Sequence, residues 1–429
     1  MARHIDRLTK VSAQACLVLL SLVGLSVAAL AQVNVYTRSY NTARTSANLQ
    51  ETILTPANVN STNFGKLFIV QTDGEAYAQP LYVSGLAIAG GTHNVVFVAT
   101  MRDSVYAIDA DNGAVLWTKN FGAPINPANV QSVQNISDTT GVGIVSTPVI
   151  DPATNIMYFV TSTQYQQGST TVYGRQLNAI EIATGLPVGA TPVNITATYA
   201  TPDLAAPLVF NPQRQNNRAG LALANGNVYI AFASHDDIIP YNGWVLAYSA
   251  STLAQIAVYV DTTIGSQGGI WNAGQAPAVD GAGNLYLSSG NGSFGKTAND
   301  LYQTGNSFIK LSPTLQLLDY FTPYNSASLN SGDQDLGSSG LMLLPNTNYV
   351  VGGGKQGVLY LSNTSAMGEF KASGDHVHQE FQAVYGLGTS HIHGTPSYFD
   401  SDVNGPTPAV HRQKCFLPPP LRSGIARWS

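Results

Sequence analysis

Apolar and polar residues alternate with a period of two in short runs along most of this chain. In the clearest example, the run Val105–Asp109 is followed by the polar residues Asp111, Asn112 and Gly113 and then by a second apolar run that begins at Val115. Such alternation is typical of a half-buried β-strand, and an Asp-Asn-Gly cluster is typical of a tight turn. The pattern therefore predicts a strand, a turn and an antiparallel return strand.

Comparable groups of apolar runs recur along the chain, and each group has the length of a four-stranded antiparallel unit. Five such units are predicted to begin at Ala78, Ser146, Gly220, Ala276 and Ser339, and Ile392–Tyr398 is expected to open a sixth. Repetition of this kind predicts an all-β fold, a β-propeller whose four-stranded blades surround a central channel. Because the strands form the scaffold, we expect the function to lie in loops around that channel.

Both ends of the repeat region carry a separate expectation. Residues 32–65 are interpreted as an extended N-terminal segment and residues 66–405 as the propeller, with Lys66–Gln71 as a strand that completes the last blade and removes an exposed edge. Residues 406–429 contain several basic residues, no acidic residue and the run Pro418–Pro420. We interpret that segment as a non-native or disordered tail and expect the propeller to be truncated there.

The amino terminus has the three parts of a secretory signal peptide. Basic residues occupy the first ten positions, an apolar run extends from Ala15 to Leu30, and Ala29-Leu30-Ala31 forms a cleavage site of small residues. The run is too short for a membrane span, and no other stretch reaches the length that a span requires. We therefore expect residues 1–31 to be removed and the protein to be exported, to the periplasm or the extracellular space, without a membrane span.

The net charge and the cysteine content limit the classes of partner and the disulfides that the protein can have. Removal of the signal peptide takes three of the 19 basic and one of the 24 acidic residues, which leaves a net charge near −7. That charge argues against nucleic acid as a partner. Cys415 is then the one remaining cysteine, so no internal disulfide is expected. We expect a monomer that binds a small molecule or a protein.

The segment Ala107–Trp117 also carries the pattern Ala-x-Asp-x-x-x-Gly-x-x-x-Trp, which resembles the repeat of the quinoprotein-like (pyrroloquinoline-quinone repeat) β-propellers. The resemblance implies that Trp117 packs between neighbouring blades. Longer stretches, including Tyr77–Val83, His93–Thr100 and Gly352–Gly357, resemble secreted bacterial members of this group whose activity is not established.

For the cofactor, the resemblance implies less. Quinoprotein alcohol dehydrogenases place two adjacent cysteines over the quinone and hold calcium with Glu, Asn and Asp, next to an Asp base. This chain has no adjacent cysteines, and no motif in its sequence matches the calcium ligands of those dehydrogenases. The cofactor is therefore unknown: the resemblance allows pyrroloquinoline quinone and calcium, but no set of residues in the sequence supports them. The catalytic residues are also unknown.

One loop of the third unit holds the densest group of polar and aromatic residues. A carboxylate beside an imidazole suits acid–base chemistry, and aromatic rings suit stacking on a planar or sugar-like ligand. A loop packed around its own tryptophan would have the same composition. The ligand-binding candidates in this loop and at related positions of the fourth unit are His235, Asp236, Tyr241, Trp244, Trp271 and Asn291.

Metal and nucleotide signals are weaker. His391 and His393 are expected on one face of a strand, a spacing that metal ligands use, but no third ligand follows at a diagnostic spacing. Asp333 and Asp335 are expected in a solvated or turn-forming loop. The glycine-rich stretch 290–297 fits a phosphate-loop pattern without the helix that such a loop requires, so we interpret it as a connection between strands.

Three functions remain open from the sequence. The favoured one is an exported binding or scaffold propeller with a ligand site around the channel. The first alternative is a pyrroloquinoline-quinone-dependent dehydrogenase with an atypical site, and the second is a carbohydrate-processing propeller that uses His235 with Asp236 or Tyr241. The sequence alone does not decide whether the protein is an enzyme.

Overall fold

The protein is a β-propeller, seen in a computed structural model that describes residues 33–55, 57–130, 141–384, 391–399 and 414–416. Contacts divide the chain into two units. Residues 34–49 and 65–429 form the propeller unit, and the described part of the other unit, residues 33, 50–55 and 57–64, contains turns and no helix or strand. The predicted signal peptide lies outside the described residues.

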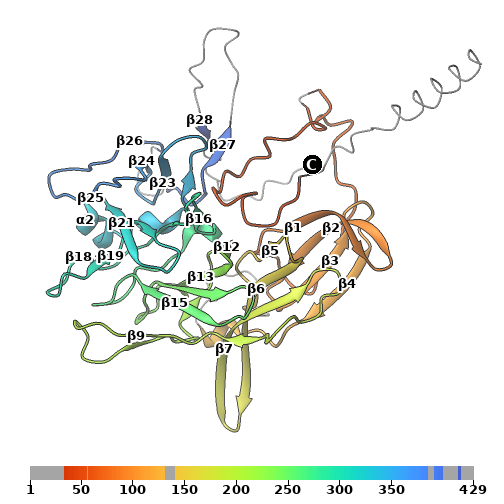
Figure 1. The fold of residues 1–429 in the computed structure, drawn as a ribbon, viewed down its shortest axis with the longest axis horizontal. Helices are drawn as coiled ribbons and strands as arrows, with labels where there is room; N and C mark the ends of the chain where they lie inside the picture. The colour runs from red at the N-terminus through yellow and green to blue at the C-terminus, as the bar shows by residue number, and fades with distance from the viewer. Residues whose placement is uncertain (1–32, 56, 131–140, 385–390, 400–413, 417–429) are drawn as a thin grey trace, which may run out of the picture. The chain divides into compact units, whose positions relative to one another are not determined.

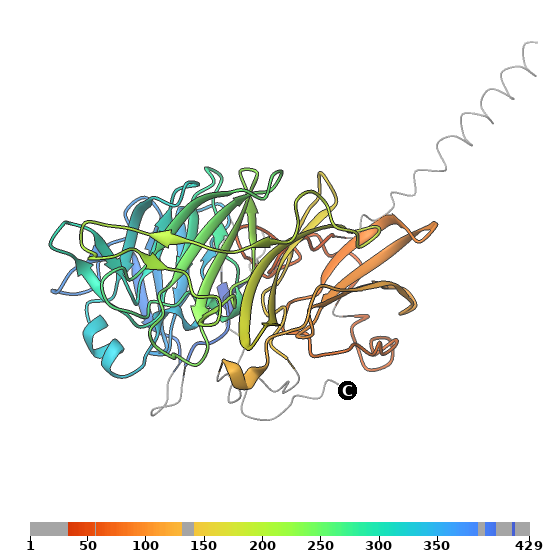
Figure 2. The same cartoon turned by 90° about the horizontal axis from the view of Figure 1, so that it is seen from below.

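Successive antiparallel sheets form the blades, and in Figures 1 and 2 they follow one another in chain order around a common centre. Blade 1 is β1 (Leu81–Ile88), β2 (Gly91–Ala99), β3 (Ser104–Asp109) and β4 (Val115–Asn120). Blade 2 is β5 (Val149–Asp151), β6 (Ile156–Gln167), β7 (Thr170–Glu181) and β8 (Val193–Asn194). Blade 3 is β12 (Ala222–Ala224), β13 (Asn227–Ser234), β14 (Trp244–Ser249) and β15 (Gln255–Val260), with β11 (Gln215–Asn216) also paired to β13.

The later blades keep this order and carry insertions. Blade 4 is β16 (Ala278–Val279), β17 (Leu285–Ser288), β20 (Phe308–Leu311) and β21 (Leu317–Thr322), and β25 (Glu369–Phe370) pairs parallel to β21. Blade 5 is β22 (Met342–Leu343), β23 (Tyr349–Gly353), β24 (Val358–Asn363) and β26 (Gln379–Gln382). Small elements between the blades are β9 (Thr198–Tyr199) with β10 (Leu208–Val209), the hairpin β18 (Phe294–Lys296) with β19 (Tyr302–Thr304), η1 (Pro127–Asn129), η3 (Asn272–Gly274), α2 (Ser326–Ser331) and η4 (Leu336–Ser338).

These sheets confirm the sequence prediction of repeated four-stranded units. The hydrophobic core lies between the blades, because each of five apolar clusters joins one sheet to the next, from blades 1 and 2 to blades 5 and 6. Trp117 shows how a blade is joined to its neighbour. Its indole Nε1 donates to the carbonyl of Ile182 in blade 2 at 3.0 Å, as the repeat motif implies.

Residues 34–46 tie the blades together near the first strands. Main-chain hydrogen bonds of 2.8–3.0 Å link this segment to the first strands of five blades. Val35 and Tyr82 exchange two such bonds in blade 1. In the other four blades a strand amide donates to a carbonyl of the segment: Ile150 to Tyr36, Val279 to Thr42, Leu343 to Ala43 and Tyr398 to Thr45. The buried guanidinium of Arg44 adds hydrogen bonds to the carbonyl of Pro277, at 3.0 and 2.8 Å. The predicted boundary at residue 66 therefore differs from the structure, in which residues 34–49 belong to the propeller unit.

The prediction that Lys66–Gln71 forms a strand of the last blade is wrong. The structure assigns no strand to these residues. They lie beside blade 1 and not in the last blade, because the Phe68 ring is so close to Gly113 that a Cβ there would approach it to 2.7 Å. In addition, the Asp73 amide donates to the Tyr106 hydroxyl at 3.0 Å. An apolar run alone did not show which blade it would join.

A sixth sheet begins where the sequence predicted one. β27 (Ser397–Phe399) pairs antiparallel with β28 (Lys414–Phe416), so these three residues of the expected tail form a strand. The other residues of 406–429 lie outside the described residues.

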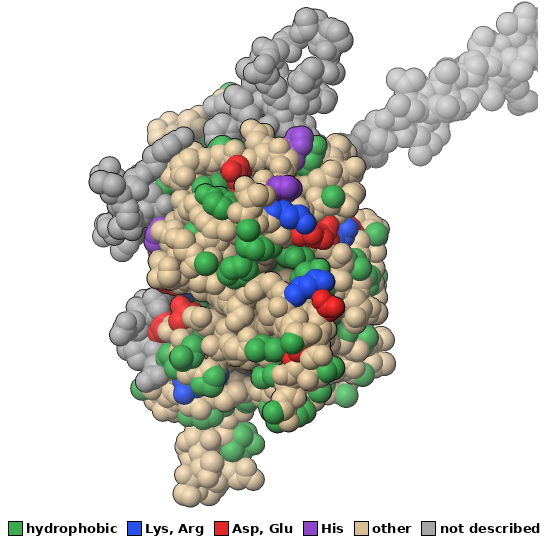
Figure 3. All heavy atoms as spheres, turned by 90° about the vertical axis from the view of Figure 1, so that its left-hand side faces the viewer, with side chains coloured by type: hydrophobic (Ala, Val, Ile, Leu, Met, Phe, Trp, Pro, Cys, Tyr) green, Lys and Arg blue, Asp and Glu red, His purple; other side chains and the backbone are tan. Residues whose placement is uncertain are grey.

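On the face drawn in Figure 3, acidic and basic side chains are scattered among uncharged ones, as expected for a chain with 10% charged residues.

Candidate functional site

A cavity of about 400 Å³ opens at one end of the inner strands. One group of its lining residues repeats from blade to blade. Each member precedes the first strand of its blade by four residues, or by five in blade 4: Tyr77, Val145, Arg218, Ala273, Ser338 and His393. The hydrogen bonds of residues 34–46 are made further along the same strands. The cavity is therefore on the propeller axis, where the sequence analysis expected a ligand site.

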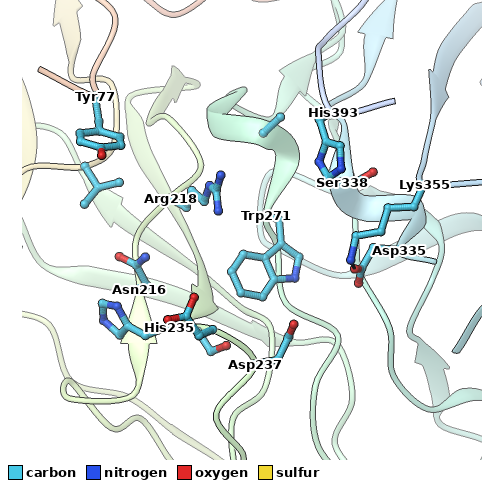
Figure 4. A pocket seen from close by; sticks show the side chains of 14 residues that line it. Tyr77, Asn216, Arg218, His235, Asp237, Trp271, Asp335, Ser338, Lys355 and His393 are labelled. Carbon is cyan, nitrogen blue, oxygen red and sulfur yellow. Dashed lines mark ion pairs between the residues drawn. The ribbon is translucent and has the colours of Figure 1, made fainter. Parts of the chain in front are cut away.

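Strand ends and loops supply the rest of the wall. The end of β13 contributes Ser234, and the loop that follows it contributes His235, Asp236 and Asp237. Asn216 comes from β11, and other loops contribute Trp271, Asp335 and Lys355. In Figure 4, Arg218 and Trp271 lie between a group that contains Asn216 and His235 and a group that contains Asp335 and Lys355. A volume in this range suits a small-molecule site.

His235 is fixed by a buried arginine. Nη2 of Arg175 lies 2.8 Å from Nε2 of His235, and both residues are buried. Because a guanidinium can only donate, Nε2 must accept, and the ring proton is on Nδ1. Burial, together with the charges of Arg175 and Arg214, holds the pKa of His235 well below its ordinary value. His235 is therefore a neutral ring, which suits a hydrogen-bonding role better than that of a general base.

Two aspartates on the same loop are held in an uncommon backbone conformation. Asp236 and Asp237 have φ angles of 50° and 53°, in the left-handed region that residues other than glycine rarely adopt. Burial raises the pKa of both carboxyls above the ordinary value. For Asp237, a hydrogen bond opposes this rise without cancelling it. The donor of that bond is the Tyr241 hydroxyl, 2.5 Å from Oδ1 of Asp237, and the Tyr241 ring packs edge-on to Trp271 at 6.3 Å.

An ion pair forms the opposite side of the cavity. Nζ of Lys355 lies 2.6 Å from Oδ2 of Asp335 and 3.0 Å from Oδ2 of Asp333. Burial lowers the pKa of Lys355, but both carboxylates act against it, and the pKa lies above its ordinary value. Asn291 braces this group, since its amide N donates to Oδ1 of Asp335 at 2.7 Å and its Nδ2 to Oδ1 of Asp333 at 2.8 Å.

The structure divides the predicted site residues into three groups. His235, Asp236 and Trp271 line the cavity, while Tyr241 and Asn291 lie behind it and hydrogen-bond to lining or adjacent carboxylates. Trp244 is not part of the site. It lies on β14 with a side chain that packs edge-on against Phe210 at 5.7 Å, in the core between blades 2 and 3.

Two further predictions need correction. His391 and His393 do not lie on a strand, which begins only at Ser397, although their facing nitrogens are 3.3 Å apart and His393 lines the cavity. Asp335 is not solvated: it is buried in its ion pair with Lys355, whereas Asp333 is exposed. Among the residues that the structure describes, no group of three or more His, Cys, Asp or Glu side chains could hold a metal ion.

The sequence analysis missed Tyr77, Asn216, Arg218 and Lys355. Arg218 and Tyr77 would have been found by aligning the units at their first strands, because both occupy the repeated position on the axis. Gly290, the first residue of the phosphate-loop-like stretch, has a packing role. A Cβ at this position would lie 2.4 Å from Oδ1 of Asp335 and 2.9 Å from Trp271, so a glycine is needed there for close approach.

Comparison with known proteins defines the class of fold. No family model and no curated protein matches the chain. Solved structures do match: a quinohemoprotein alcohol dehydrogenase from Pseudomonas putida HK5, at 16% identity over 82% of this chain with a TM-score of 0.54, and one from Comamonas testosteroni, at 13% over 83% with the same score. A europium-containing methanol dehydrogenase matches at 14% identity over 85% of the chain, again with a TM-score of 0.54.

The chain therefore has the fold of the quinoprotein-type β-propellers, and the resemblance found in the sequence is confirmed at that level. At identities of 13–16% the likeness concerns the fold. The chain spans 48%, 51% and 60% of the lengths of these three proteins. No helix within the described residues has the length and apolar character needed to cross a membrane.

Proposed function

We propose that this protein is an exported binding propeller that holds a small polar molecule in the axial cavity. One observation carries the proposal: the cavity wall contains buried polar atoms without a hydrogen-bond partner among the described residues. Oδ1 of Asn216 and Oδ2 of Asp236 are such atoms. Buried polar atoms without a partner are costly, and a bound ligand or water would satisfy them.

The backbone of the cavity loop supports the same proposal. Two successive aspartates in the left-handed region cost free energy, and such strain is concentrated at functional sites. The aromatic face of Trp271 and the charged groups around it provide the mixture of apolar surface and oriented polar atoms that small-molecule sites contain.

A ligand screen by thermal shift tests this proposal. The mature protein and two variants, Trp271→Ala and Tyr165→Ala, are screened against a library of polar metabolites. Tyr165 is the control because it is an exposed aromatic residue on β6, outside the cavity lining. We expect compounds that raise the Tm of the wild type and of Tyr165→Ala but not that of Trp271→Ala. Hits whose effect is equal in all three proteins, or a screen without hits, would contradict the proposal.

A quinone-dependent dehydrogenase is the second candidate, favoured by the fold and by one cluster. Asn291 with Asp333 and Asp335 provides two of the three residue types that hold calcium in the alcohol dehydrogenases. The fit is incomplete. No glutamate lines the described cavity, the described residues contain no metal-binding group of three His, Cys, Asp or Glu side chains, and the sequence has no adjacent cysteines. We therefore derive no catalytic step through the quinone.

Titration with pyrroloquinoline quinone, with and without calcium, decides this candidate. Saturable binding at micromolar quinone that is lost in Trp271→Ala would support it, and turnover of an alcohol with an artificial electron acceptor would establish it. Binding that does not saturate removes the candidate.

Export and a monomeric state belong to the same proposal. The support for export is the signal-like amino terminus, and amino-terminal sequencing of the protein recovered outside the cytoplasm should begin near Gln32. Sedimentation should give the mass of one chain. A protein that keeps Met1, or one that sediments as a dimer, would contradict these two points.

A further inference from the structure

Arg218 is a cation that faces the cavity without an ion-pair partner. Its side chain is exposed and lies between Tyr77 and Trp271 (Figure 4). Among the described residues, no carboxylate lies within ion-pair distance of its guanidinium, and Asp236 acts on it only at longer range. A guanidinium presents paired donors that match a carboxylate, so this position in the cavity suits an anion.

The opposite side of the cavity accepts hydrogen bonds without favouring a cation. Asp335 is already paired with Lys355 at 2.6 Å, and Lys355 would repel a second positive charge. Asp237 receives the Tyr241 hydroxyl on Oδ1, and Oδ2 makes no hydrogen bond with a described residue. On the side of His235, Oδ1 of buried Asn216 is a further acceptor without a partner. Acceptors of this kind are best satisfied by ligand hydroxyl groups.

We propose that the ligand is a small hydroxylated carboxylate, such as a sugar acid. Its carboxylate pairs with Arg218, its hydroxyl groups donate to Asp237 and Asn216, and its carbon skeleton lies against the ring of Trp271. This assignment rests on the proposed function, because it takes the axial cavity as the binding site. It adds the charge and the hydrogen-bonding pattern of the ligand.

Three probes with one carbon skeleton test the charge. D-gluconate, D-glucitol and D-glucamine differ at one end only, where they carry a carboxylate, a hydroxymethyl group and an ammonium group. Isothermal titration of the mature protein should show that gluconate binds about 10–100-fold more tightly than glucitol, the range expected for a charge-assisted hydrogen-bonded pair. Glucamine should bind most weakly. Affinity for gluconate that does not exceed that for glucitol overturns the inference.

Substitutions then test the position. Arg218→Gln should reduce the affinity for gluconate to that for glucitol, and Arg218→Lys should restore part of the difference because it keeps the charge and loses the paired geometry. Lys371→Gln is the matched control: it removes the same charge at an exposed lysine outside the cavity lining. Near-ultraviolet circular dichroism verifies that each variant is folded. Equal loss of gluconate binding in Arg218→Gln and Lys371→Gln would overturn the assignment of Arg218.

The experiment separates this inference from the proposed function. If glucitol or glucamine binds in a manner that depends on Trp271 while gluconate does not, the cavity is a ligand site and the carboxylate assignment is wrong. If no probe binds, and no compound of the screen distinguishes Trp271→Ala from the wild type, both the assignment and the proposed function are wrong.

Discussion

Asp261 should make the stability of the folded protein fall as the pH rises from about 4 towards neutrality. Its carboxyl group is fully buried between β15 and the β18–β19 hairpin, where the Thr304 hydroxyl donates to Oδ1 and Oδ2 has no partner among the described residues. Burial raises the pKa of Asp261 to about 7, against an ordinary value of 3.8. Below pH 4 the group is protonated in both the folded and the unfolded chain, and its contribution does not change with pH.

Between pH 4 and pH 7 the unfolded chain releases this proton while the folded protein retains it. The free energy of unfolding therefore decreases as the pH rises, and the decrease levels off above pH 7, when the folded protein ionises as well. The change in pKa corresponds to about 4 kcal/mol as an upper limit. In Asp261→Asn the proton is not exchanged and this contribution disappears.

Urea unfolding at several pH values measures the effect. The difference in unfolding free energy between wild type and Asp261→Asn should fall by about 2–4 kcal/mol from pH 4 to pH 8. Asp280→Asn is the control, because hydrogen bonds such as that from Asn284 hold the pKa of Asp280 below its ordinary value despite burial, so its carboxylate is ionised in both states above pH 5. A difference for Asp261→Asn that is constant from pH 4 to pH 8 would show that the folded protein does not hold the Asp261 proton up to neutral pH.

Three further predictions concern the blades and the cavity. Arg44→Ala leaves the carbonyl of Pro277 without its buried donor and should lower the free energy of unfolding by about 3 kcal/mol in urea; a loss below about 1 kcal/mol would show that residues 34–46 do not depend on it. Trp117→Phe removes the hydrogen bond to Ile182 and should cost about 1 kcal/mol by the same measurement, whereas an unchanged midpoint would contradict the inter-blade role. For His235, whose pKa lies well below the ordinary value, nitrogen NMR should show a neutral ring at pH 5.5, and a protonated Nε2 at that pH would contradict the Arg175 contact.

Much of the fold could be predicted because each blade repeats its own local signal. Alternation and turn residues located β3 and β4 within one residue of their observed bounds. The fate of Lys66–Gln71 could not be predicted, since a lone apolar run shows no preference for one blade. Residues 34–46 were missed for a related reason: their main-chain hydrogen bonds leave little trace in the side-chain sequence.

The site could be predicted where its residues lie on one polar loop or, as for Trp271, at a related position of the next unit. His235 and Asp236 were found on one loop, but Trp244 was included with them although strand alternation turns its ring into the core. Arg218 and Lys355 come from different blades, and neither the sequence around Arg218 nor the glycine-rich stretch 352–357 around Lys355 indicates a ligand site. Only the ring of inner strands brings them to one cavity.

A crystal structure of the mature protein with bound gluconate would show whether the axial cavity holds a hydroxylated carboxylate. We expect one gluconate in the axial cavity, with its carboxylate within hydrogen-bond distance of the Arg218 guanidinium and its carbon skeleton against Trp271. A cavity that contains only water under saturating gluconate, or a ligand bound elsewhere on the propeller, would contradict this expectation.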